Sequence, residues 1–456
     1  MNSLIFTDVT GMPGIGKDGG AYKVASFNRT LGIETQVVDY FSHMSIRDIQ
    51  DIIDRFVYKD TSMVGFSTTH FSKMMPEIAP TYVKELSKRE YYNKILKKFS
   101  LFPQSDEWIK KVFTMVKKKN SNTQIVVGGY KTYFQRNFPS VDSWVIGPIE
   151  FNFSNSMYIW NPEDYIASEE FVPIEIGRGC SNNCPFCNYS KEREERNLTS
   201  LKHEFQRNYE LYGIQRYMFL DPVMNNARKV CELILSLSFP IEWTSFMRLD
   251  SFSKDPELRE LVLESGAKSI QFGIETTNID TSRRIGKPYD PDVLYYLREK
   301  WESKILTGSG FIVGLPGETE KTIEKMLMEI SEPSFPLDSI NLSLLYIRHY
   351  QEGSNIDYSL YSQNPSKYGY EYSKGNVWNN GNLSSEKAQE MLHSFSMSDR
   401  FRNKRKIGDY HFYARLRNLN YPHEVIMNKT IGDKEFIDEI YKYKNLYVER
   451  YKTWLK

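Results

Sequence analysis

The chain has 456 residues, of which 40% are hydrophobic and 26% charged, and its formal net charge is +1. This balance is typical of globular proteins, and the small net charge gives no indication of a polyanionic partner. The sequence lacks the run of about 18 apolar residues that a membrane span needs. It also begins without the basic and apolar regions of a signal peptide. Three of the four cysteines fall within one short loop, so we expect a reducing, cytoplasmic environment rather than a disulfide framework.

The first 150 residues alternate short apolar runs with segments of helical periodicity. This alternation predicts an open, doubly wound (Rossmann-like) parallel sheet, whose ligands would bind at the carboxyl ends of the strands. Residues 71–120 read as a long insertion with helical patterning, which would cap the ligand or fill its place. The expected strands are 4–9, 32–39, 63–67, 124–129 and 144–147, and the expected helices include 21–31 and 45–56.

One motif in this domain has the spacing of a phosphate-binding loop. Residues 11–17 match G-x-x-x-x-G-K between an expected strand and an expected helix. A phosphate-binding loop then needs Ser or Thr for magnesium, but the next residue is Asp18, whose carboxylate would oppose phosphate charge. We therefore expect no nucleotide hydrolysis and interpret the segment as a strand-to-helix turn that lines the ligand cleft.

After a linker at 151–170, an apolar strand at 171–176 leads into the cysteine loop. Cys180, Cys184 and Cys187 are spaced C-x3-C-x2-C. All-cysteine zinc sites usually use two C-x2-C pairs, and this sequence has no second pair. Three thiolates on a [4Fe–4S] cluster leave one iron without a protein ligand, and that iron can bind a substrate or cosubstrate. Gly177 and Gly179 would let the backbone wrap closely around such a cluster.

Residues 171–345 repeat strand-helix units. We expect six parallel strands with outer helices, which form a partial TIM-type (β/α)6 barrel with its chemistry at the carboxyl ends of the strands. The cysteine loop lies at the first of these ends. The expected strands after the loop are 217–220, 241–246, 269–275, 307–315 and 339–345, and the expected helices are 199–211, 227–237, 256–265 and 291–304.

The cysteine spacing, followed by these strand ends in this order, resembles the radical S-adenosylmethionine (SAM) superfamily. The resemblance implies that the open iron chelates the amino and carboxylate groups of SAM. An electron from the cluster would then split SAM into methionine and a 5'-deoxyadenosyl radical. Phe186 matches the family's aromatic residue beside the last cysteine, which packs near the adenine. The alternative is a zinc-stapled or redox-inert loop.

The same resemblance suggests roles at the other strand ends. Glu275 matches the carboxylate that holds the ribose hydroxyls, since a carboxylate accepts two such hydroxyls well. Residues 310–318, with Ile312 and Gly314, match the strand whose backbone contacts adenine. Each remaining candidate has a structural salt bridge, cap or packing role as its alternative. These candidates are Asp221 at the second strand end, Arg248 at the third as a bidentate partner of the SAM carboxylate, Lys287 after the fourth, and Tyr189 in the site wall.

Three strand ends of the first domain resemble the cobalamin-binding domain that precedes many radical SAM domains. Small residues there would let a nucleotide loop approach the backbone. The candidates are Ser67, Thr68, Gly128, Gly129 and Gly147. The sequence lacks the D-x-H-x-x-G motif that supplies a cobalt-ligating histidine in some cobalamin proteins, and many radical SAM relatives lack it too. Cobalamin binding and a degenerate, empty domain therefore remain alternatives.

The last segment, 346–456, is rich in Tyr, Asn, Lys and Arg. It resembles the small helical domain with which cobalamin-type radical SAM proteins often close the barrel and shape the substrate pocket. Residues 400–418 mix cations with aromatics, a composition that can bind RNA or a phosphorylated substrate. We favour a solvated helix face for this stretch over a nucleic-acid site.

The sequence therefore predicts a three-domain α/β enzyme that uses a [4Fe–4S] cluster, SAM and cobalamin. The favoured reaction is cobalamin-dependent C-methylation of an unactivated carbon in a small-molecule or peptide substrate. A reducing partner such as flavodoxin or ferredoxin would supply electrons. The alternatives are a cobalamin-free radical rearrangement, dehydration or epimerisation and, outside enzymes, an RNA-binding or scaffold protein with a structural cluster.

Overall fold

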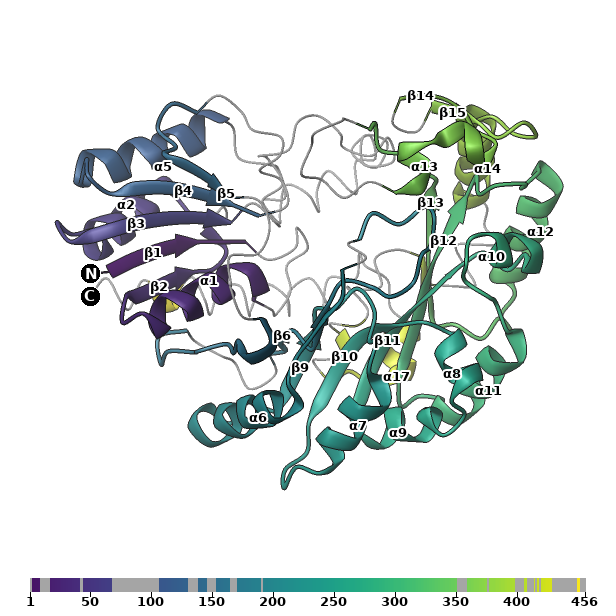
Figure 1. Cartoon of the computed structure of the whole chain (residues 1–456), viewed down its shortest axis with the longest axis horizontal. Coiled ribbons are helices and arrows are strands. Elements are labelled where there is room, and N and C mark those ends of the chain that lie inside the picture. Colours follow the sequence, from purple (N-terminus) through teal and green to yellow (C-terminus); the bar gives the residue numbers. More distant parts are fainter. Residues whose placement is uncertain are drawn as a thin grey trace. The chain divides into compact units, whose positions relative to one another are not determined.

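The computed structural model contains two compact units, residues 1–173 with 431–456, and residues 174–430 (Figure 1). Most of the two sheets and the cysteine loop are described, whereas much of the segment after residue 397 is not. The structure describes residues 2–8, 17–41, 44–67, 106–129, 138–145, 153–164, 170–189, 192–350, 359–374, 377–397, 406–407, 414, 416–417, 420–428 and 449–451.

The first unit is built on a five-stranded parallel sheet with the order β2-β1-β3-β4-β5. The chain adds β2 on one side of β1 and then adds β3 on the other side, so the strand order reverses between β1 and β3. Such a switch point is where open parallel sheets bind their ligands. The expected parallel sheet is confirmed. Its strands are β1 (Asn2–Phe6), β2 (Glu34–Val38), β3 (Thr61–Ser67), β4 (Gln124–Gly128) and β5 (Ser143–Val145).

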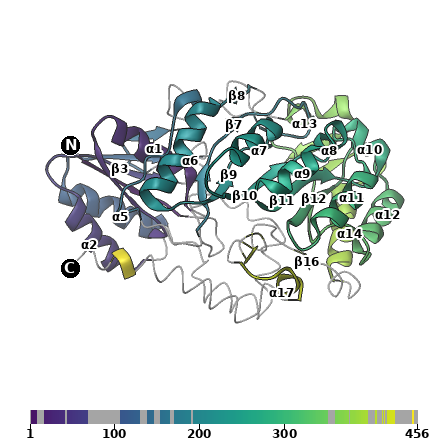
Figure 2. The same cartoon turned by 90° about the horizontal axis from the view of Figure 1, so that it is seen from below.

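Helices cover both faces of this sheet. Helix α1 (Gly19–Thr30) lies on one face, and α2 (Ile46–Phe56) and α5 (Asp106–Lys119) lie on the other (Figure 1, Figure 2). Isoleucines of α2 and valines of α5 pack on the inner strands in one buried cluster. A reciprocal capping box between Ser45 and Asp48 fixes where α2 begins. The expected insertion contributes α5, and its earlier part lies outside the described residues.

The second unit holds a seven-stranded sheet with the order β16-β13-β12-β11-β10-β9-β6. Neighbouring strands from β9 through β13 to β16 pair in parallel, as expected for a partial barrel. The seventh strand comes from the C-terminal segment, which we expected to be mainly helical. The strands are β6 (Val172–Ile174), β9 (Arg216–Phe219), β10 (Glu242–Met247), β11 (Ala267–Glu275), β12 (Leu306–Val313), β13 (Ser339–Leu344) and β16 (Lys406–Ile407).

The helices of this unit lie along the outer side of the sheet (Figure 2). They follow β6, β9, β10, β11 and β12 in sequence, so the carboxyl ends of these strands open into loops that lead to helices, where (β/α) barrels place their chemistry. The helices are α6 (Leu198–Tyr212), α7 (Ala227–Leu235), α8 (Asp250–Lys254), α9 (Leu258–Glu264), α10 (Ile279–Arg284), α11 (Pro291–Trp301) and α12 (Glu320–Ser331).

The chain after β13 packs back onto the second unit. It forms α13 (Leu360–Gln363), a 3-10 turn (Pro365–Tyr368) and the antiparallel hairpin of β14 (Glu371–Lys374) and β15 (Val377–Asn379). Helices α14 (Ser385–Met397) and α17 (His423–Asn428) follow. The described residues from 359 to 428 therefore belong to the barrel unit, and the expected boundary at 345 stays a prediction.

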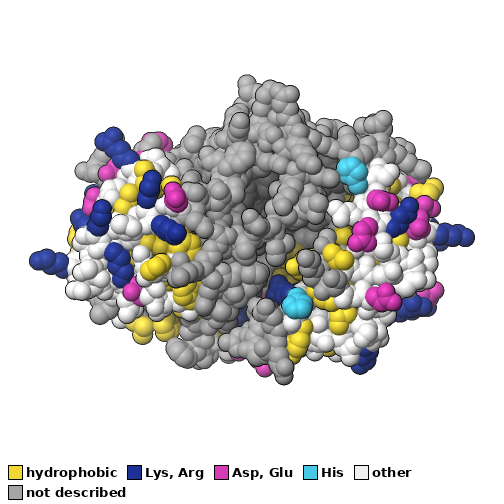
Figure 3. Space-filling model, turned by 90° about the horizontal axis from the view of Figure 1, so that it is seen from above, with side chains coloured by type: hydrophobic (Ala, Val, Ile, Leu, Met, Phe, Trp, Pro, Cys, Tyr) yellow, Lys and Arg dark blue, Asp and Glu magenta, His cyan; other side chains and the backbone are white. Residues whose placement is uncertain are grey.

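The surface of the described residues carries both charge signs. On the face in Figure 3, Lys, Arg, Asp and Glu side chains are interspersed, in keeping with the net charge of +1. Within the described ranges, none of the helices combines the length and the hydropathy that crossing a membrane requires.

Candidate functional site

The cysteine loop begins and ends at a small two-stranded ribbon. β7 (Gly177–Arg178) pairs antiparallel with β8 (Glu194–Glu195), which brings the two ends of the loop together. Each cysteine sulfur receives an N–H. The amide of Asn182 lies 3.4 Å from Cys180 Sγ, the amide of Tyr189 lies 3.5 Å from Cys187 Sγ, and Cys184 Sγ has a side-chain donor. N–H donors stabilise the thiolate, the form in which cysteine binds metals.

Asp221, after β9, supports the entry to this loop. Its carboxylate is buried and accepts the amide of Ile176 at 3.0 Å. Burial raises the pKa of this carboxyl well above its usual range, and the backbone N–H groups of Ile176 and Gly177 oppose that rise. A side chain at Gly177 would lie 3.2 Å from Asp221 Oδ1, so the absence of a Cβ there lets the carboxylate approach the strand. Asp221 thus contacts the backbone that positions the cysteines, and a direct catalytic role stays a prediction.

Arg248, after β10, supplies the donor to Cys184, the second cysteine of the loop. Its Nη1 lies 3.4 Å from Cys184 Sγ, and its Nη2 donates to Gly286 O at 2.9 Å. The other edge of the guanidinium pairs with Asp250 at 2.7 and 3.2 Å. Arg248 is therefore paired bidentately with a carboxylate, but this carboxylate is the side chain of Asp250, whereas we expected the carboxylate of SAM.

Glu275, at the end of β11, is connected to the cysteine loop through Lys287. The ammonium of Lys287 pairs with Glu275 Oε1 and lies 5.4 Å from the ring centroid of Phe186. Gly273 has no side chain in the space that Lys287 Nζ occupies. The structure thus brings together Phe186, Glu275 and Lys287, which are far apart in sequence and which the sequence placed in one cavity.

The end of β12 forms a tight turn around Gly314, whose φ is 104°. Glu318 accepts the amides of Gly314 and Leu315 at 2.8 and 3.0 Å, and burial raises its pKa to about 7. Tyr370 donates its hydroxyl to Gly314 O at 2.8 Å. Both polar backbone groups of Gly314 thus have protein partners, although the carbonyl keeps a second lone pair. Contact of Ile312 and Gly314 with adenine stays a prediction.

Residues 359–374 and 377–380, which we call the strap, connect the cysteine loop to this turn. At one end, the amide of Tyr361 donates to Pro185 O at 3.1 Å, and the amide of Ser359 donates to Asn188 Oδ1 at 2.8 Å. At the other end, the Trp378 ring fills the space where Gly314 would carry a side chain. Tyr361 is 1% exposed, and its hydroxyl has no hydrogen-bond partner among the described residues. The sequence patterns do not predict the strap, whose main signal is a run of Tyr and Trp residues between Pro and Gly turns.

In the first unit, Asp18 occupies the switch point between β1 and β3. Its carboxylate accepts the amide of Gly20 as the N-cap of α1, and it accepts hydroxyls from Thr7 and Ser67 at the ends of β1 and β3. The helix N-terminus, which often binds an anion, is thus capped by the protein's own carboxylate. Gly129, with φ 108°, follows β4. The candidates Thr68 and Gly147 lie outside the described residues.

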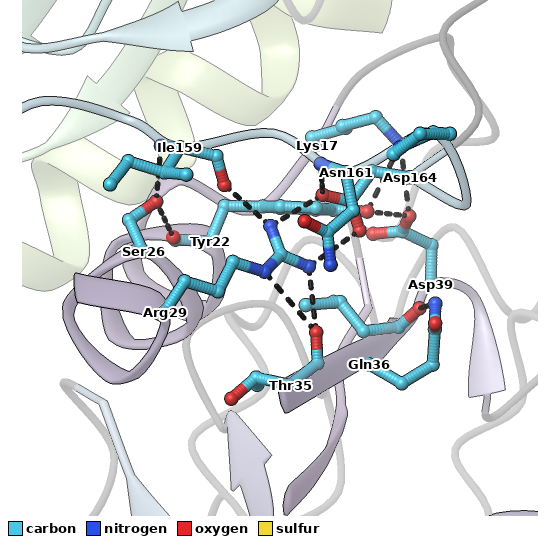
Figure 4. A network of polar contacts seen from close by, with 12 residues as sticks. Lys17, Tyr22, Ser26, Arg29, Thr35, Gln36, Asp39, Ile159, Asn161 and Asp164 are labelled. Carbon is cyan, nitrogen blue, oxygen red and sulfur yellow. Dashed lines mark hydrogen bonds and ion pairs between the residues drawn. The ribbon is translucent and has the colours of Figure 1, made fainter. Parts of the chain in front are cut away.

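Lys17, the lysine of the phosphate-loop-like motif, forms polar contacts within a buried network of side chains (Figure 4). Its ammonium lies 3.2 Å from Asp39 Oδ2 and 3.0 Å from Tyr22 Oη. Burial opposes its charge, but the carboxylates of Asp39, Glu170 and Asp164 hold its pKa above the usual value. Nearby, Arg29 pairs with Asp164 at 2.6 Å. The lysine is thus an internal counter-ion in this unit, while residues 9–16 of the motif lie outside the described part.

The comparisons agree with this geometry. A model of the Radical SAM superfamily matches residues 174–330, the segment that contains the three cysteines, Arg248, Glu275 and Gly314. Residues 174–330 form a radical SAM domain. This assignment confirms the family resemblance seen in the sequence.

Curated relatives match a similar length of chain. The anaerobic magnesium-protoporphyrin IX monomethyl ester cyclase of Cereibacter sphaeroides is 25% identical over 183 residues, which are 37% of this chain and 29% of the relative. The cytidylyl-2-hydroxyethylphosphonate methyltransferase of Streptomyces wedmorensis is 26% identical over 175 residues, 36% of this chain and 32% of the relative. The chain thus spans about a third of the length of these two relatives.

One solved structure resembles most of the chain. It is the radical S-adenosylmethionine methyltransferase TsrM from Kitasatospora setae, determined with cobalamin and a [4Fe-4S] cluster bound. The TM-score is 0.54 at 12% sequence identity, and the match covers 79% of this chain and 74% of TsrM. The two proteins therefore share a fold, which extends well beyond the radical SAM domain.

A radical SAM domain implies a [4Fe–4S] cluster and SAM, and the residues present fit both. Three cysteine sulfurs lie on one loop and each accepts an N–H. Phe186 lies in that loop, and Lys287 and Glu275 lie beside it. The ring of Phe186 suits the adenine of SAM, the Lys287 ammonium suits its carboxylate, and the Glu275 carboxylate suits its ribose hydroxyls. Within the described ranges, no three His, Cys, Asp or Glu side chains are grouped to hold a single metal ion.

Two further candidates are only partly placed. Tyr189 is 55% exposed, and its amide donates to Cys187 Sγ. Its role in the site wall stays a prediction. Most of 400–418 lies outside the described residues. Within it, Arg417 donates to Ser303 O and Lys304 O at 3.0 Å each, so this cation is bound within the second unit.

Proposed function

We propose that this protein is a radical SAM enzyme whose Cys180, Cys184 and Cys187 hold a [4Fe–4S] cluster with one open iron. The observation that carries the proposal is the bridge from Glu275 through Lys287 to Phe186. This bridge brings the end of the fourth barrel strand to the cysteine loop, as binding of one molecule of SAM requires. When bound, the cluster and SAM supply the electron and the 5'-deoxyadenosyl radical, and the protein supplies orientation and exclusion of water.

The residues around the loop would divide the recognition of SAM among them. Glu275 would accept the two ribose hydroxyls, and the Lys287 ammonium would exchange its pairing with Glu275 for the SAM carboxylate. Phe186 would pack against the adenine beside the Gly314 turn. The strap covers this side of the site, since it bonds to both the cysteine loop and Gly314. It would therefore limit the access of water to the radical.

For the reaction class, we favour cobalamin-dependent methylation of an unactivated carbon in a small-molecule or peptide substrate. Two observations support it. The first unit has the strand order of sheets that bind a nucleotide-like cofactor at the β1/β3 switch point. The similar fold of TsrM, which is a methyltransferase and whose structure holds cobalamin, covers 79% of this chain and therefore reaches into the first unit, because the second unit is residues 174–430 only.

A cobalamin-free radical reaction is the second candidate, and one observation favours it. At the switch point, Ser67 and Thr7 already donate their hydroxyls to Asp18. The polar side chains there thus bond to one another. A rearrangement, dehydration or epimerisation would need no ligand in the first unit.

Anaerobic reconstitution tests both parts of this proposal, the cleavage of SAM at the cluster and the binding of cobalamin. We expect four irons per chain, release of 5'-deoxyadenosine from SAM with dithionite, and a corrinoid absorbance spectrum that persists after gel filtration. Cys184→Ala should lose iron and SAM cleavage, whereas Cys231→Ala, a change to the buried cysteine of α7, should retain both. SAM cleavage without retained corrinoid would favour the second candidate. Zinc in place of iron, or no 5'-deoxyadenosine, would refute the radical SAM proposal.

A further inference from the structure

The three cysteine sulfurs have different hydrogen-bond donors. Cys180 Sγ accepts from the backbone and side-chain amides of Asn182, and Cys187 Sγ accepts from a backbone amide. Cys184 is buried, and its sulfur accepts from the guanidinium of Arg248. One of the three proposed cluster ligands is therefore in contact with a full positive charge.

The guanidinium of Arg248 is fixed on its other sides. Asp250 binds it through both carboxylate oxygens, and Gly286 O accepts from Nη2 at 2.9 Å. Lys254 in turn donates to Asp250 Oδ2 at 2.8 Å. Arg248 is 7% exposed, so solvent screens its charge only weakly. These bonds leave Nη1 directed at the sulfur, and they occupy the edge that would otherwise bind the SAM carboxylate.

A charge at this position affects one cluster oxidation state more than the other. One-electron reduction adds a negative charge to the cluster and its thiolates. Hydrogen bonds to the ligand sulfurs and nearby positive charge therefore stabilise the reduced state and raise the reduction potential. The effect is strongest for a buried, charged donor.

We propose that Arg248 is a positioning residue for the cluster, one that orients Cys184 Sγ and raises the cluster's reduction potential. This inference rests on the proposed function, because it assumes that Cys184 is a cluster ligand. It assigns the guanidinium to the cluster instead of to the carboxylate of SAM. The residue would thus determine how strong a reductant the enzyme needs.

The test is a redox titration of the reconstituted cluster, monitored by electron paramagnetic resonance without SAM. In Arg248→Met, we expect the one-electron reduction equilibrium to shift about tenfold toward the oxidised form, which is about 59 mV. Arg248→Lys keeps the charge but loses the fork, so it should shift less in the same direction. Arg228→Met is the matched control, because Arg228 lies on α7 and pairs with Asp255 and Glu257 instead of with Cys184, and the potential of this variant should equal that of the parent.

Iron content separates the possible failures. If Arg248→Met and Arg248→Lys hold full iron at the parental potential, the inference is wrong. If Arg248→Met does not hold a cluster, the potential of Arg248→Lys decides alone. Full iron at the parental potential in this variant would then overturn the inference. A parental potential combined with a tenfold loss of SAM affinity would also overturn it, since that result would assign Arg248 to the SAM carboxylate. Failure of the parent protein itself to hold iron would instead refute the proposed function.

Discussion

Glu275 has a backbone φ of 68°, which is uncommon for a residue other than glycine. The β11–β12 pairing is irregular between Phe272 and Glu275. Left-handed backbone at a non-glycine residue costs about 1–3 kcal/mol, and such strain collects at functional sites. The strain is consistent with a carboxylate that must leave the line of the strand to reach a ligand.

The first residue-scale prediction concerns this carboxylate. Glu275→Gln should weaken SAM binding by about 10–100-fold, because a neutral acceptor contributes about 1 kcal/mol less than a charged one to each of the two bonds from the ribose hydroxyls. Equilibrium binding to the reconstituted protein measures it. Glu194→Gln, a change of an exposed carboxylate on β8, is the control and should bind SAM as the parent does. Equal affinities for both variants would contradict the assigned role.

The second residue-scale prediction concerns pH. Burial raises the pKa of Glu318 to about 7, against the N–H groups of Gly314 and Leu315. Between about pH 4.5 and 7, the folded chain therefore holds a proton that the unfolded chain has released. The stability from this proton is complete below about pH 4.5 and is lost as the pH rises through about 7, a loss on the order of 3 kcal/mol.

Urea denaturation of the whole chain at pH 5 and pH 8, followed through the unfolding of the second unit, measures this loss of stability. The parent should lose more stability over this interval than Glu318→Gln, whose amide does not titrate. Parallel pH dependence in the two proteins would show that Glu318 does not carry the effect.

At the scale of elements, the strap and the Gly314 turn depend on each other. A Cβ at residue 314 would overlap the Trp378 ring, and the φ of 104° would be strained for any other residue. Gly314→Ala should therefore destabilise the second unit by about 2–4 kcal/mol. Gly310→Ala, within the strand β12 that precedes this turn, meets nothing within 4 Å and should change stability by less than about 0.5 kcal/mol. Chemical denaturation distinguishes them, and equal losses would argue against the contact.

The elements also show what the sequence could and could not predict. Residues that carry the chemistry stand at strand ends, and alternation of strands with helices brings those ends to one edge, so Cys184, Glu275 and their neighbours could be grouped from local patterns. One hydrogen bond of the strap, from Ser359 to Asn188, joins residues 171 positions apart, and no local periodicity encodes such a contact. The pattern also predicts Arg248 at a strand end, but it does not show that Asp250, only two residues on, pairs with the guanidinium.

At the scale of the whole chain, the described residues near the C-terminus pack on the first unit. The amide of Asp39 donates to the hydroxyl of Tyr451 at 2.7 Å, and both residues are buried. Tyr451→Phe should destabilise the first unit by about 1–3 kcal/mol, because the amide loses its partner away from water.

Hydrogen exchange can localise this loss. Amides of β1 and β2 should exchange faster in Tyr451→Phe, while those of β10 to β12 should keep their protection. Tyr58→Phe, a change of an exposed tyrosine in the same unit, should leave both sets unchanged. Faster exchange throughout the chain would contradict a local role for Tyr451.

The hydrogen bond from the Tyr361 amide to Pro185 O, which joins the strap to the cysteine loop, has a consequence for biosynthesis. The cysteine loop leaves the ribosome long before the residues that will close over it, and translation proceeds at about 5–20 residues per second. For many seconds the nascent loop is without its cover. Assembly factors that deliver iron and sulfide would therefore meet accessible thiols on the growing polypeptide, and completion of the strap would then enclose the loaded metal.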